Sequence, residues 1–107
     1  MTTRYGDIPE VTVKNYFKSL VGKTYKILPM KEENSKTLKS YIESYCVELL
    51  GVKLLIEVLQ NEPQFLSLLS ILTYLANGEY NNSVCKREVF KCIRIINSIS
   101  ESYFEGV

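Results

Sequence analysis

The side chains that could carry out chemistry in this chain are its cysteines, its serines and a few carboxylates. The chain has three cysteines, Cys46, Cys85 and Cys92, and it has no histidine. Serine and cysteine nucleophiles usually take their general base from histidine, so the sequence predicts no triad chemistry. A C-x6-C pair with a distant third cysteine also matches no zinc-site spacing. We therefore expect all three thiols to be small core side chains.

The carboxylates give no stronger signal. Asp7 is the single aspartate, and Glu32-Glu33 is the only adjacent acidic pair. This pair lies in the polar string PMKEENSK, which is typical of a solvated helix approach, whereas an acid/base pair needs a pocket that shifts its pKa. Calcium-loop, dinucleotide-binding and P-loop strings are absent. We predict a protein that is not an enzyme, with no catalytic residue, metal, cofactor or small-molecule substrate; an enzyme would have to rely on Tyr, Lys or Glu in a pocket.

The composition is that of one globular domain. The 107 residues are 46% apolar and 23% charged, with a net charge of +1. We expect a single helical domain over residues 1–107, with loose termini at 1–9 and 104–107. The opening MTTRYGDIPE has no apolar signal region, and the longest uncharged run, residues 63–78, is shorter than the roughly 20 residues of a membrane span. With three cysteines that form no even disulfide framework, these features predict a cytoplasmic protein without membrane contact.

Apolar residues recur at helical spacing along most of the chain, and no alternating β pattern of useful length competes. Short polar connections join the helical stretches, which suits antiparallel neighbours. The fold class predicted is therefore all-α, an antiparallel bundle of four helices. Their expected ranges are 10–28, 35–60, 62–77 and 83–103.

Prolines and short polar residues predict the helix ends. Asp7 with Glu10 resembles a capping box for the first helix, and Thr12 is the alternative cap. Pro29 disfavours helical geometry at the residue before it, so the first helix should end there. The expected caps of the later helices are Asn34 or Ser35, then Asn61, and then Ser83.

The second helix carries an apolar stripe that runs in unbroken phase from Leu38 to Leu59. Gly51 interrupts this stretch, and the string ELLGVK also resembles a helix end with a left-handed glycine cap. Because the stripe keeps its phase across Gly51, we favour one continuous helix, with a break into a fifth helix as the alternative. The predicted core is Phe17, Leu20, Leu38, Ile42, Leu49, Ile56, Leu69, Leu72, Val89, Cys92 and Ile96.

A second apolar line of Leu50, Leu54 and Val58 runs along the opposite side of the same helix. One stripe can face the bundle, so the second line indicates either a helix in the middle of the fold or a protein interface. Together with the lack of catalytic groups, this line predicts a non-catalytic adaptor or accessory subunit. We expect it to bind a protein partner that the sequence does not identify and to form a homo-oligomer.

Basic residues are concentrated in two parts of the chain. Residues 11–31 carry five lysines and no acid, whereas residues 32–79 carry seven glutamates against three lysines. In the last helix, Arg87, Lys91 and Arg94 form a ridge opposite the inner stripe. This ridge is either an ordinary solvated face or part of a nucleic-acid-binding accessory module, which is the alternative function. The residues of that module are Lys14, Lys18, Lys23, Lys26, Lys86, Arg87, Lys91 and Arg94.

Three strings, KILPMKEENS, FLSLLSIL and KREVFKCI, resemble sequences of small uncharacterised helical proteins of clostridial phages and mobile elements. The resemblance spans about residues 15–98. It implies an origin in a phage or mobile element and implies no activity, so no functional residue is carried over from it.

Overall fold

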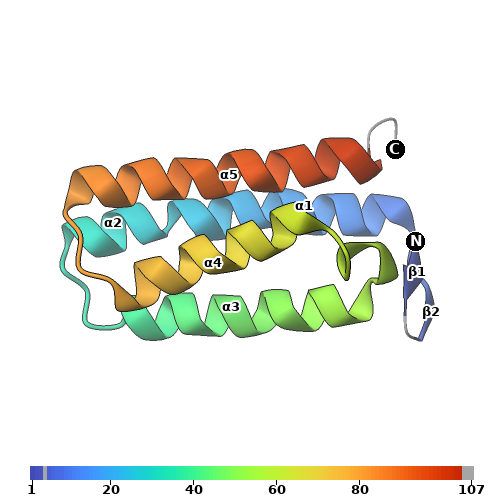
Figure 1. The fold of residues 1–107 in the computed structure, drawn as a ribbon, viewed down its shortest axis with the longest axis horizontal. Coiled ribbons are helices and arrows are strands. Elements are labelled where there is room, and N and C mark those ends of the chain that lie inside the picture. Colours follow the sequence, from blue (N-terminus) through green and yellow to red (C-terminus); the bar gives the residue numbers. More distant parts are fainter. Residues whose placement is uncertain (4, 105–107) are drawn as a thin grey trace.

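The computed structural model describes residues 1–3 and 5–104 and confirms the all-α bundle (Figure 1). Of the residues that it describes, 79% are helical. Helix α2 continues α1 in almost the same direction, so the helices form a bundle of four rods that run alternately up and down. The helices are α1 (Glu10–Tyr25), α2 (Ile27–Glu32), α3 (Leu38–Leu55), α4 (Pro63–Asn77) and α5 (Asn82–Phe104).

The four rods form a closed ring of neighbours. Helix α3 lies against α4, α4 lies against α5, and α5 lies against both α1 and α2. The backbones of α1 and α3 approach each other less closely than those of the other adjacent pairs. Long side chains bridge this wider side of the bundle, and they form the polar groove described below.

The core lies where the inward sides of the rods meet. Most of the predicted core is buried: Phe17, Leu20, Ile42, Leu49, Ile56, Leu72, Val89, Cys92 and Ile96. The prediction is wrong for Leu38 and Leu69, which are only half-buried and pack against the edge of the core. Leu38 is the first residue of α3 and lies at the end of the bundle. On α4, Leu68 and Leu72 occupy the inward side, one turn apart, and Leu69 lies beside that side.

The prediction that Pro29 ends the first helix is wrong. The interruption comes earlier, at Lys26, and the chain then resumes as α2 with Pro29 in its first turn. A proline is tolerated there because the first N–H groups of a helix have no partner within the helix. The turn after α2 contains Asn34, whose φ of 53° is left-handed, so Asn34 does not cap the next helix. Helix α3 begins after Thr37, without a side-chain cap from Ser35.

Helix α3 runs through Gly51 without a break, which confirms the prediction of a continuous helix at this point. The predicted end near residue 60 is wrong, because α3 ends at Leu55. Ile56 is extended, and a short 3-10 helix, η1 (Glu57–Leu59), follows it. Both Ile56 and Leu59 are nonetheless buried. The last two residues of the predicted stripe therefore still reach the core, although they lie beyond the end of the helix. The extended conformation of Ile56 and the 3-10 turn that follows direct both side chains inward.

The caps of α4 and α5 each lie one or two residues from the predicted position. For α4, a carboxylate oxygen of Glu62 accepts a hydrogen bond from the Gln64 N–H at 2.8 Å, so Glu62 takes the place expected for Asn61. For α5, the side-chain carbonyl of Asn81 accepts a hydrogen bond from the Val84 N–H at 2.9 Å, where Ser83 was expected to cap. Both residues satisfy N–H groups of the first helical turn.

Helix α1 begins after Pro9 and has no side-chain cap, so the capping box of Asp7 and Glu10 is not formed and Thr12 does not replace it. Asp7 instead belongs to a small antiparallel hairpin of β1 (Thr2–Thr3) and β2 (Gly6–Asp7). Gly6 has a φ of 121°, which favours glycine. The hairpin rests on the end of the bundle, where Thr3 forms a bridge with Ile56.

The segments expected to be loose have packing partners where the structure describes them. The hairpin occupies most of residues 1–9, and Phe104 is fully buried with its ring centroid 5.4 Å from that of Phe17. Residues 105–107 lie outside the described part of the chain. Among the helices that are described, none has the length and apolar character needed to cross a bilayer.

Leu72 is fully buried and Leu69 is half-buried, and this difference in burial gives a direct test of the core. We expect Leu72→Ala to lower the free energy of unfolding by about 2–5 kcal/mol, the usual range for a buried leucine. Leu69→Ala, at the edge of the core, should lower it by about 2 kcal/mol or less, because less apolar surface is exposed by the change. Urea denaturation of both variants measures the difference. An equal loss of unfolding free energy in the two variants would contradict the placement of Leu69 at the edge of the core.

Candidate functional site

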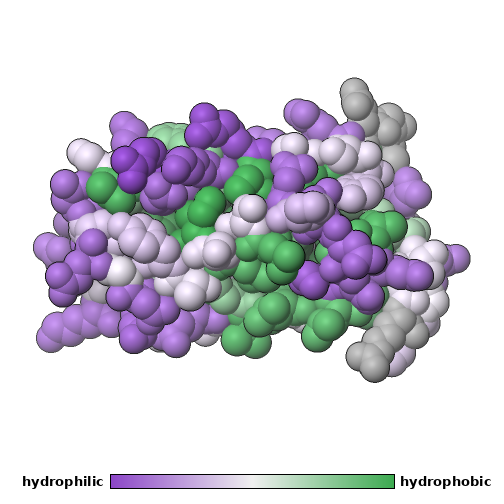
Figure 2. All heavy atoms as spheres, in the orientation of Figure 1, coloured by the Kyte–Doolittle hydropathy of each residue, from purple (hydrophilic) through white to green (hydrophobic). Residues whose placement is uncertain are grey.

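The second apolar line of α3 is exposed. Leu50, Leu54 and Val58 are 48%, 59% and 41% exposed, and Val47, one turn before Leu50, is 70% exposed. In Figure 2, apolar side chains gather along the lower edge of the molecule, where Figure 1 places α3. This exposure excludes the alternative in which the helix lies in the middle of the fold. The prediction that Val58 continues this line on the same helix is wrong, because α3 ends at Leu55 and Val58 lies in η1. We call the exposed residues Val47, Leu50 and Leu54 of α3, together with Val58 of η1, the α3 apolar face.

Helical geometry explains why α3 has an inward side and an apolar outward side. Its buried residues Ile42, Tyr45 and Leu49 face the core, and the 3.6-residue period places Val47 and Leu54 on the other side of the helix. Sequence reasoning missed Val47, although it stands three positions, about one helical turn, before Leu50. It also missed Leu66 of α4, which is 57% exposed, because Leu66 was counted within a broad apolar arc.

Gly51 lies within this apolar side of α3. Its backbone is helical, and no described heavy atom outside its own helix backbone lies within 4 Å of the position that a Cβ would take. A glycine inside an exposed helix costs about 1 kcal/mol relative to alanine. Neither the conformation nor the packing of the single chain therefore requires glycine at this position.

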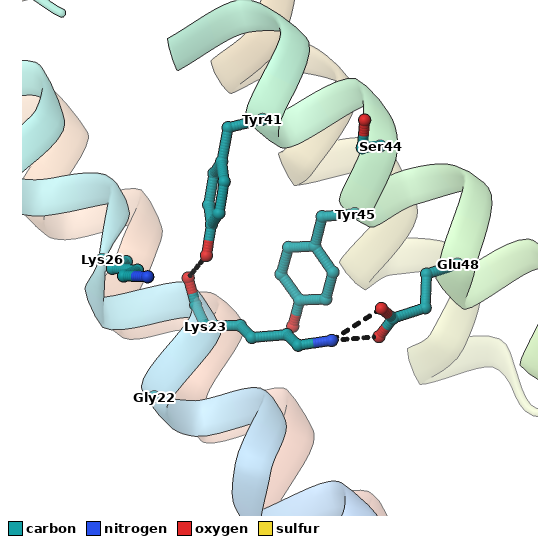
Figure 3. Close-up of a pocket in the computed structure, with 7 residues that line it drawn as sticks. All are labelled: Gly22, Lys23, Lys26, Tyr41, Ser44, Tyr45 and Glu48. Atoms are coloured by element: carbon teal, nitrogen blue, oxygen red, sulfur yellow. Dashed lines mark hydrogen bonds and ion pairs between the residues drawn. The ribbon is translucent and has the colours of Figure 1, made fainter. Parts of the chain in front are cut away.

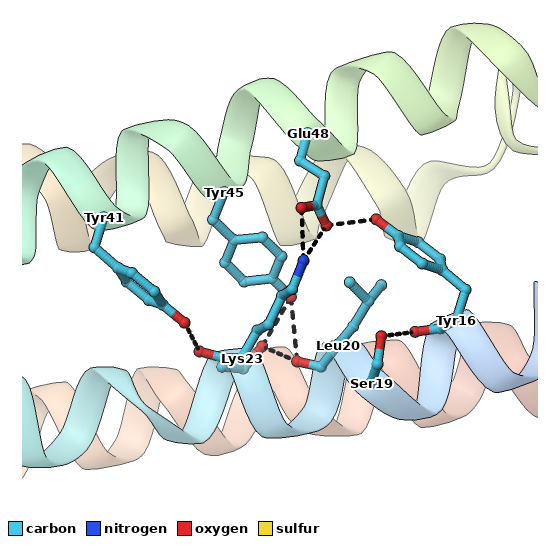
Figure 4. A network of polar contacts seen from close by, with 8 residues as sticks. Tyr16, Ser19, Leu20, Lys23, Tyr41, Tyr45 and Glu48 are labelled. Carbon is cyan, nitrogen blue, oxygen red and sulfur yellow. Dashed lines mark hydrogen bonds and ion pairs between the residues drawn. The ribbon is translucent and has the colours of Figure 1, made fainter.

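The wider side of the bundle, between α1 and α3, holds a polar groove with a cavity of about 450 Å³ (Figure 3). Lys23 donates hydrogen bonds to both carboxylate oxygens of Glu48, at 2.6 and 2.7 Å. The Tyr16 hydroxyl donates to the same carboxylate at 2.7 Å (Figure 4). Deeper in the groove, the Tyr45 hydroxyl lies 2.9 Å from Oγ1 of Thr24. Each of these contacts joins α1 to α3.

The protonation states in the groove follow from burial and from these contacts. Burial and the hydrogen bond to Glu48 raise the pKa of Tyr16 above its ordinary value, and burial raises the pKa of Tyr45 likewise. Burial also acts to raise the pKa of Glu48, but the hydrogen bonds from Lys23 and Tyr16 hold it below 4.5. At neutral pH the tyrosines are therefore protonated and the carboxylate is charged. A general base or acid needs a pKa near the working pH, so we interpret the groove as a structural brace.

The contacts of the remaining polar groups agree with this interpretation. The Tyr41 hydroxyl donates to the backbone carbonyl of Lys23 at 2.7 Å, and the Tyr45 hydroxyl also donates to that of Leu20 at 3.3 Å. Within residues 1–3 and 5–104, no buried side-chain nitrogen or oxygen lacks a hydrogen-bond partner, and no cluster of His, Cys, Asp or Glu could hold a metal ion. Of the polar side chains that line the groove, Lys23, Tyr41, Tyr45 and Glu48 are thus held in contacts between α1 and α3.

The cysteines lie inward, as expected, with one difference. Cys85 and Cys92 are buried, whereas Cys46 is half-buried at the edge of the core. Burial raises the pKa of the Cys92 thiol to about 12. The reactive form of a cysteine is the thiolate, so a thiol in this environment is inert at neutral pH.

The structure does not bring the eight basic residues onto one surface. Lys23 and Lys26 line the groove between α1 and α3. Lys91 and Arg94 line a hollow between α4 and α5, on the opposite side of the ring of helices. Lys86 lies at the junction of α5 with α2. The remaining members of the set are Lys14, which is half-buried, and Lys18 and Arg87, which are exposed.

The basic ridge of α5 is also partly neutralised. Glu88, whose side chain is only 11% exposed, accepts hydrogen bonds from Arg87 at 3.1 Å and from Lys91 at 3.2 Å. Burial acts to raise the pKa of Glu88, but these two contacts hold it below 4.5. The ridge therefore carries an ionised carboxylate in its middle, which weakens its attraction for phosphate groups.

No protein family, curated protein or solved structure matches this chain. The packing of the bundle does not account for the α3 apolar face, whose side chains are 41–70% exposed.

The carboxylates of Glu48 and Glu88 should make the protein sensitive to acid. Each has a folded-state pKa below 4.5, so each contributes stability that is present above that pH and is lost as the pH falls below it through the folded-state pKa. Urea denaturation from pH 7 to pH 3 measures this loss. We expect Glu48→Gln to remove part of the pH dependence, because the amide does not titrate.

The control for this experiment is Glu79→Gln. Glu79 is exposed and makes no side-chain hydrogen bond in the described part of the chain. Its substitution should leave the pH dependence as in the wild type. An unchanged pH profile for Glu48→Gln would show that its contacts with Lys23 and Tyr16 do not stabilise the fold.

Proposed function

We propose that this protein is a non-catalytic binding module, an adaptor or accessory subunit, that self-associates and docks on a partner protein through the α3 apolar face. The observation that carries this proposal is the exposure of three aliphatic side chains on the outward side of α3, Val47, Leu50 and Leu54, at 48–70%. Val58, in the 3-10 turn that follows, is 41% exposed. Contiguous exposed apolar surface in a small protein commonly marks an interaction site.

Most of the face is already ordered in the free chain. Val47, Leu50 and Leu54 lie on a regular helix. The opposite side of that helix is anchored in the core by Ile42 and Leu49, and Glu48 ties it to α1. A preordered surface loses little conformational entropy when it binds, so more of the gain from apolar burial appears as affinity.

The border of the face has the character of an interface rim. Glu43 and Glu57 are exposed and Lys53 is half-buried, so charged side chains surround the aliphatic centre. Protein interfaces commonly have such a polar rim around an apolar core. The net charge of +1 also produces little long-range repulsion between copies of the chain, which supports self-association.

The proposal predicts that Leu54→Glu abolishes self-association. In analytical ultracentrifugation at micromolar to high-micromolar concentration, the wild type should sediment above the monomer mass, and Leu54→Glu should sediment as a monomer, because a buried unpaired carboxylate opposes the contact. At concentrations low enough to give the monomer, the free energy of unfolding of Leu54→Glu should differ from that of the wild type by no more than about 0.5 kcal/mol.

The matched control is Val11→Glu, which makes the same kind of change at a side chain that is 50% exposed on α1. It should associate as the wild type does. A wild-type protein that stays monomeric throughout this range, with no difference between Leu54→Glu and Val11→Glu, would overturn the proposal.

A further inference from the structure

An exposed pair of aromatic rings lies across the seam between α1 and α5, two helices that run side by side in opposite directions (Figure 1). The ring centroids of Tyr25 on α1 and Phe90 on α5 are 5.9 Å apart, and the rings meet edge to face at an interplanar angle of 84°. Both side chains are exposed. An edge-to-face contact holds the rings in place and covers one face of only one ring, so flat aromatic surface remains open to another group.

Three basic side chains flank this pair. On α5, Lys86 stands four positions before Phe90 and Arg94 stands four positions after it. The helical period places all three on one strip, with each cation about 6 Å along the helix from the ring. On α1, Lys18 stands seven positions, or two turns, before Tyr25 on the same strip. All five residues are exposed, and we call them the α1–α5 aromatic face.

The three cations of this face form no ion pair or side-chain hydrogen bond with any residue of 1–3 and 5–104. The nearby acids do not neutralise them. Glu88 is buried and is bound by two other basic side chains, and Glu101 lies about 16 Å beyond Phe90 along α5, from the 1.5 Å rise per residue. Glu32 shares a hollow with Lys86, but Lys31 lines the same hollow, which therefore keeps a positive charge. The face thus attracts anions.

We propose that the α1–α5 aromatic face binds single-stranded nucleic acid. Bases stack on Tyr25 and Phe90, and the three cations hold the backbone phosphates. Proteins that bind single strands combine these two elements, cations that follow the backbone and aromatic rings on which bases stack. The inference is independent of the proposed function, because α3 lies across the ring of helices from α5.

The combination of rings and cations favours this ligand over other anions. The cations would also attract a free phosphate or an acidic peptide, but neither brings a flat group to the rings. The bases of a duplex are already stacked on one another, so a duplex would offer the face only its phosphates. Unpaired bases beside phosphates make use of both parts of the face.

Fluorescence anisotropy with the full chain tests the binding. The probes are fluorescein-labelled oligothymidine and oligouridine of about 12 nucleotides, at about 0.05 M salt. We expect binding in the micromolar range that weakens as salt is added. Three phosphate contacts predict a slope of about −2 for the logarithm of the association constant against the logarithm of the salt concentration, from about −0.7 per phosphate on a single strand.

Substitution of Phe90 separates stacking from charge. Phe90→Leu keeps an apolar side chain and removes the ring, so the dissociation constant should rise about fivefold or more, the effect of losing one stacked base. The salt slope should stay at its wild-type value. Phe90→Tyr keeps a ring and should bind as the wild type does. Circular dichroism of both variants checks that the bundle is intact.

Substitution of a flanking cation should have the complementary effect. Lys86→Gln removes one phosphate contact, so the salt slope should become shallower by about 0.7. The matched control is Lys39→Gln, which makes the same change at an exposed lysine on α3, across the bundle from the face. It should leave both the affinity and the slope unchanged.

A labelled duplex of the same length and vesicles that contain phosphatidylserine complete the test. Binding to single strands that is several-fold tighter than binding to the duplex, and that both Phe90→Leu and Lys86→Gln weaken, supports the inference. No binding of the single strands at up to about 100 μM protein overturns it. Equal binding of single strand and duplex, or an affinity that Phe90→Leu leaves unchanged, shows attraction to phosphate alone and also overturns it. Binding to the vesicles without binding to the oligonucleotides overturns it in favour of a membrane surface.

Discussion

A helix in a ring of four can bury only one of its sides in the core, and α3 carries aliphatic residues on two sides. The inward side, with Ile42 and Leu49 fully buried, fixes the rotation of the helix about its axis. Once that rotation is set, Val47 and Leu54 must point outward, because their positions on the helix leave no other direction. The exposed face is therefore a consequence of how the core is packed.

The same rotation determines the chemistry of the side between α1 and α3. It directs Tyr45 and Glu48 toward α1, where the helix backbones lie farthest apart and long polar side chains fill the space. Lys23 neutralises the Glu48 carboxylate, and Lys23 and Tyr16 both donate hydrogen bonds to it, so a charged group is accommodated at the edge of the core. A groove lined by titratable groups is thus explained by the needs of packing.

The apolar stripes of the sequence predicted the number of helical rods, their antiparallel order and most of the core, because these depend on a periodicity that is local in the chain. The helix ends were harder to predict. The capping hydrogen bond of Glu62 depends on a side chain that also accepts a hydrogen bond from Tyr103, and the end of α3 at Ile56 coincides with a bridge to Thr3. Contacts between residues so distant in sequence leave no local pattern.

The candidate site also has one part that the sequence could predict and one part that it could not. A helical wheel places Leu50 and Leu54 opposite the core stripe from the sequence alone, but it cannot show that Lys23 is bound to Glu48 or that Lys91 points away from Lys26, because both depend on how separate helices face one another.

Gly51 and the aliphatic face share a further property, which is that the single chain gains nothing from either. A glycine at an open helical position costs about 1 kcal/mol, and exposed aliphatic side chains contribute little to folding because water still contacts them in the folded state. Both features become favourable only when a second surface covers α3. In that state the aliphatic groups leave water, and the missing Cβ lets the covering backbone approach. The two features therefore both support the proposal that another surface docks on α3.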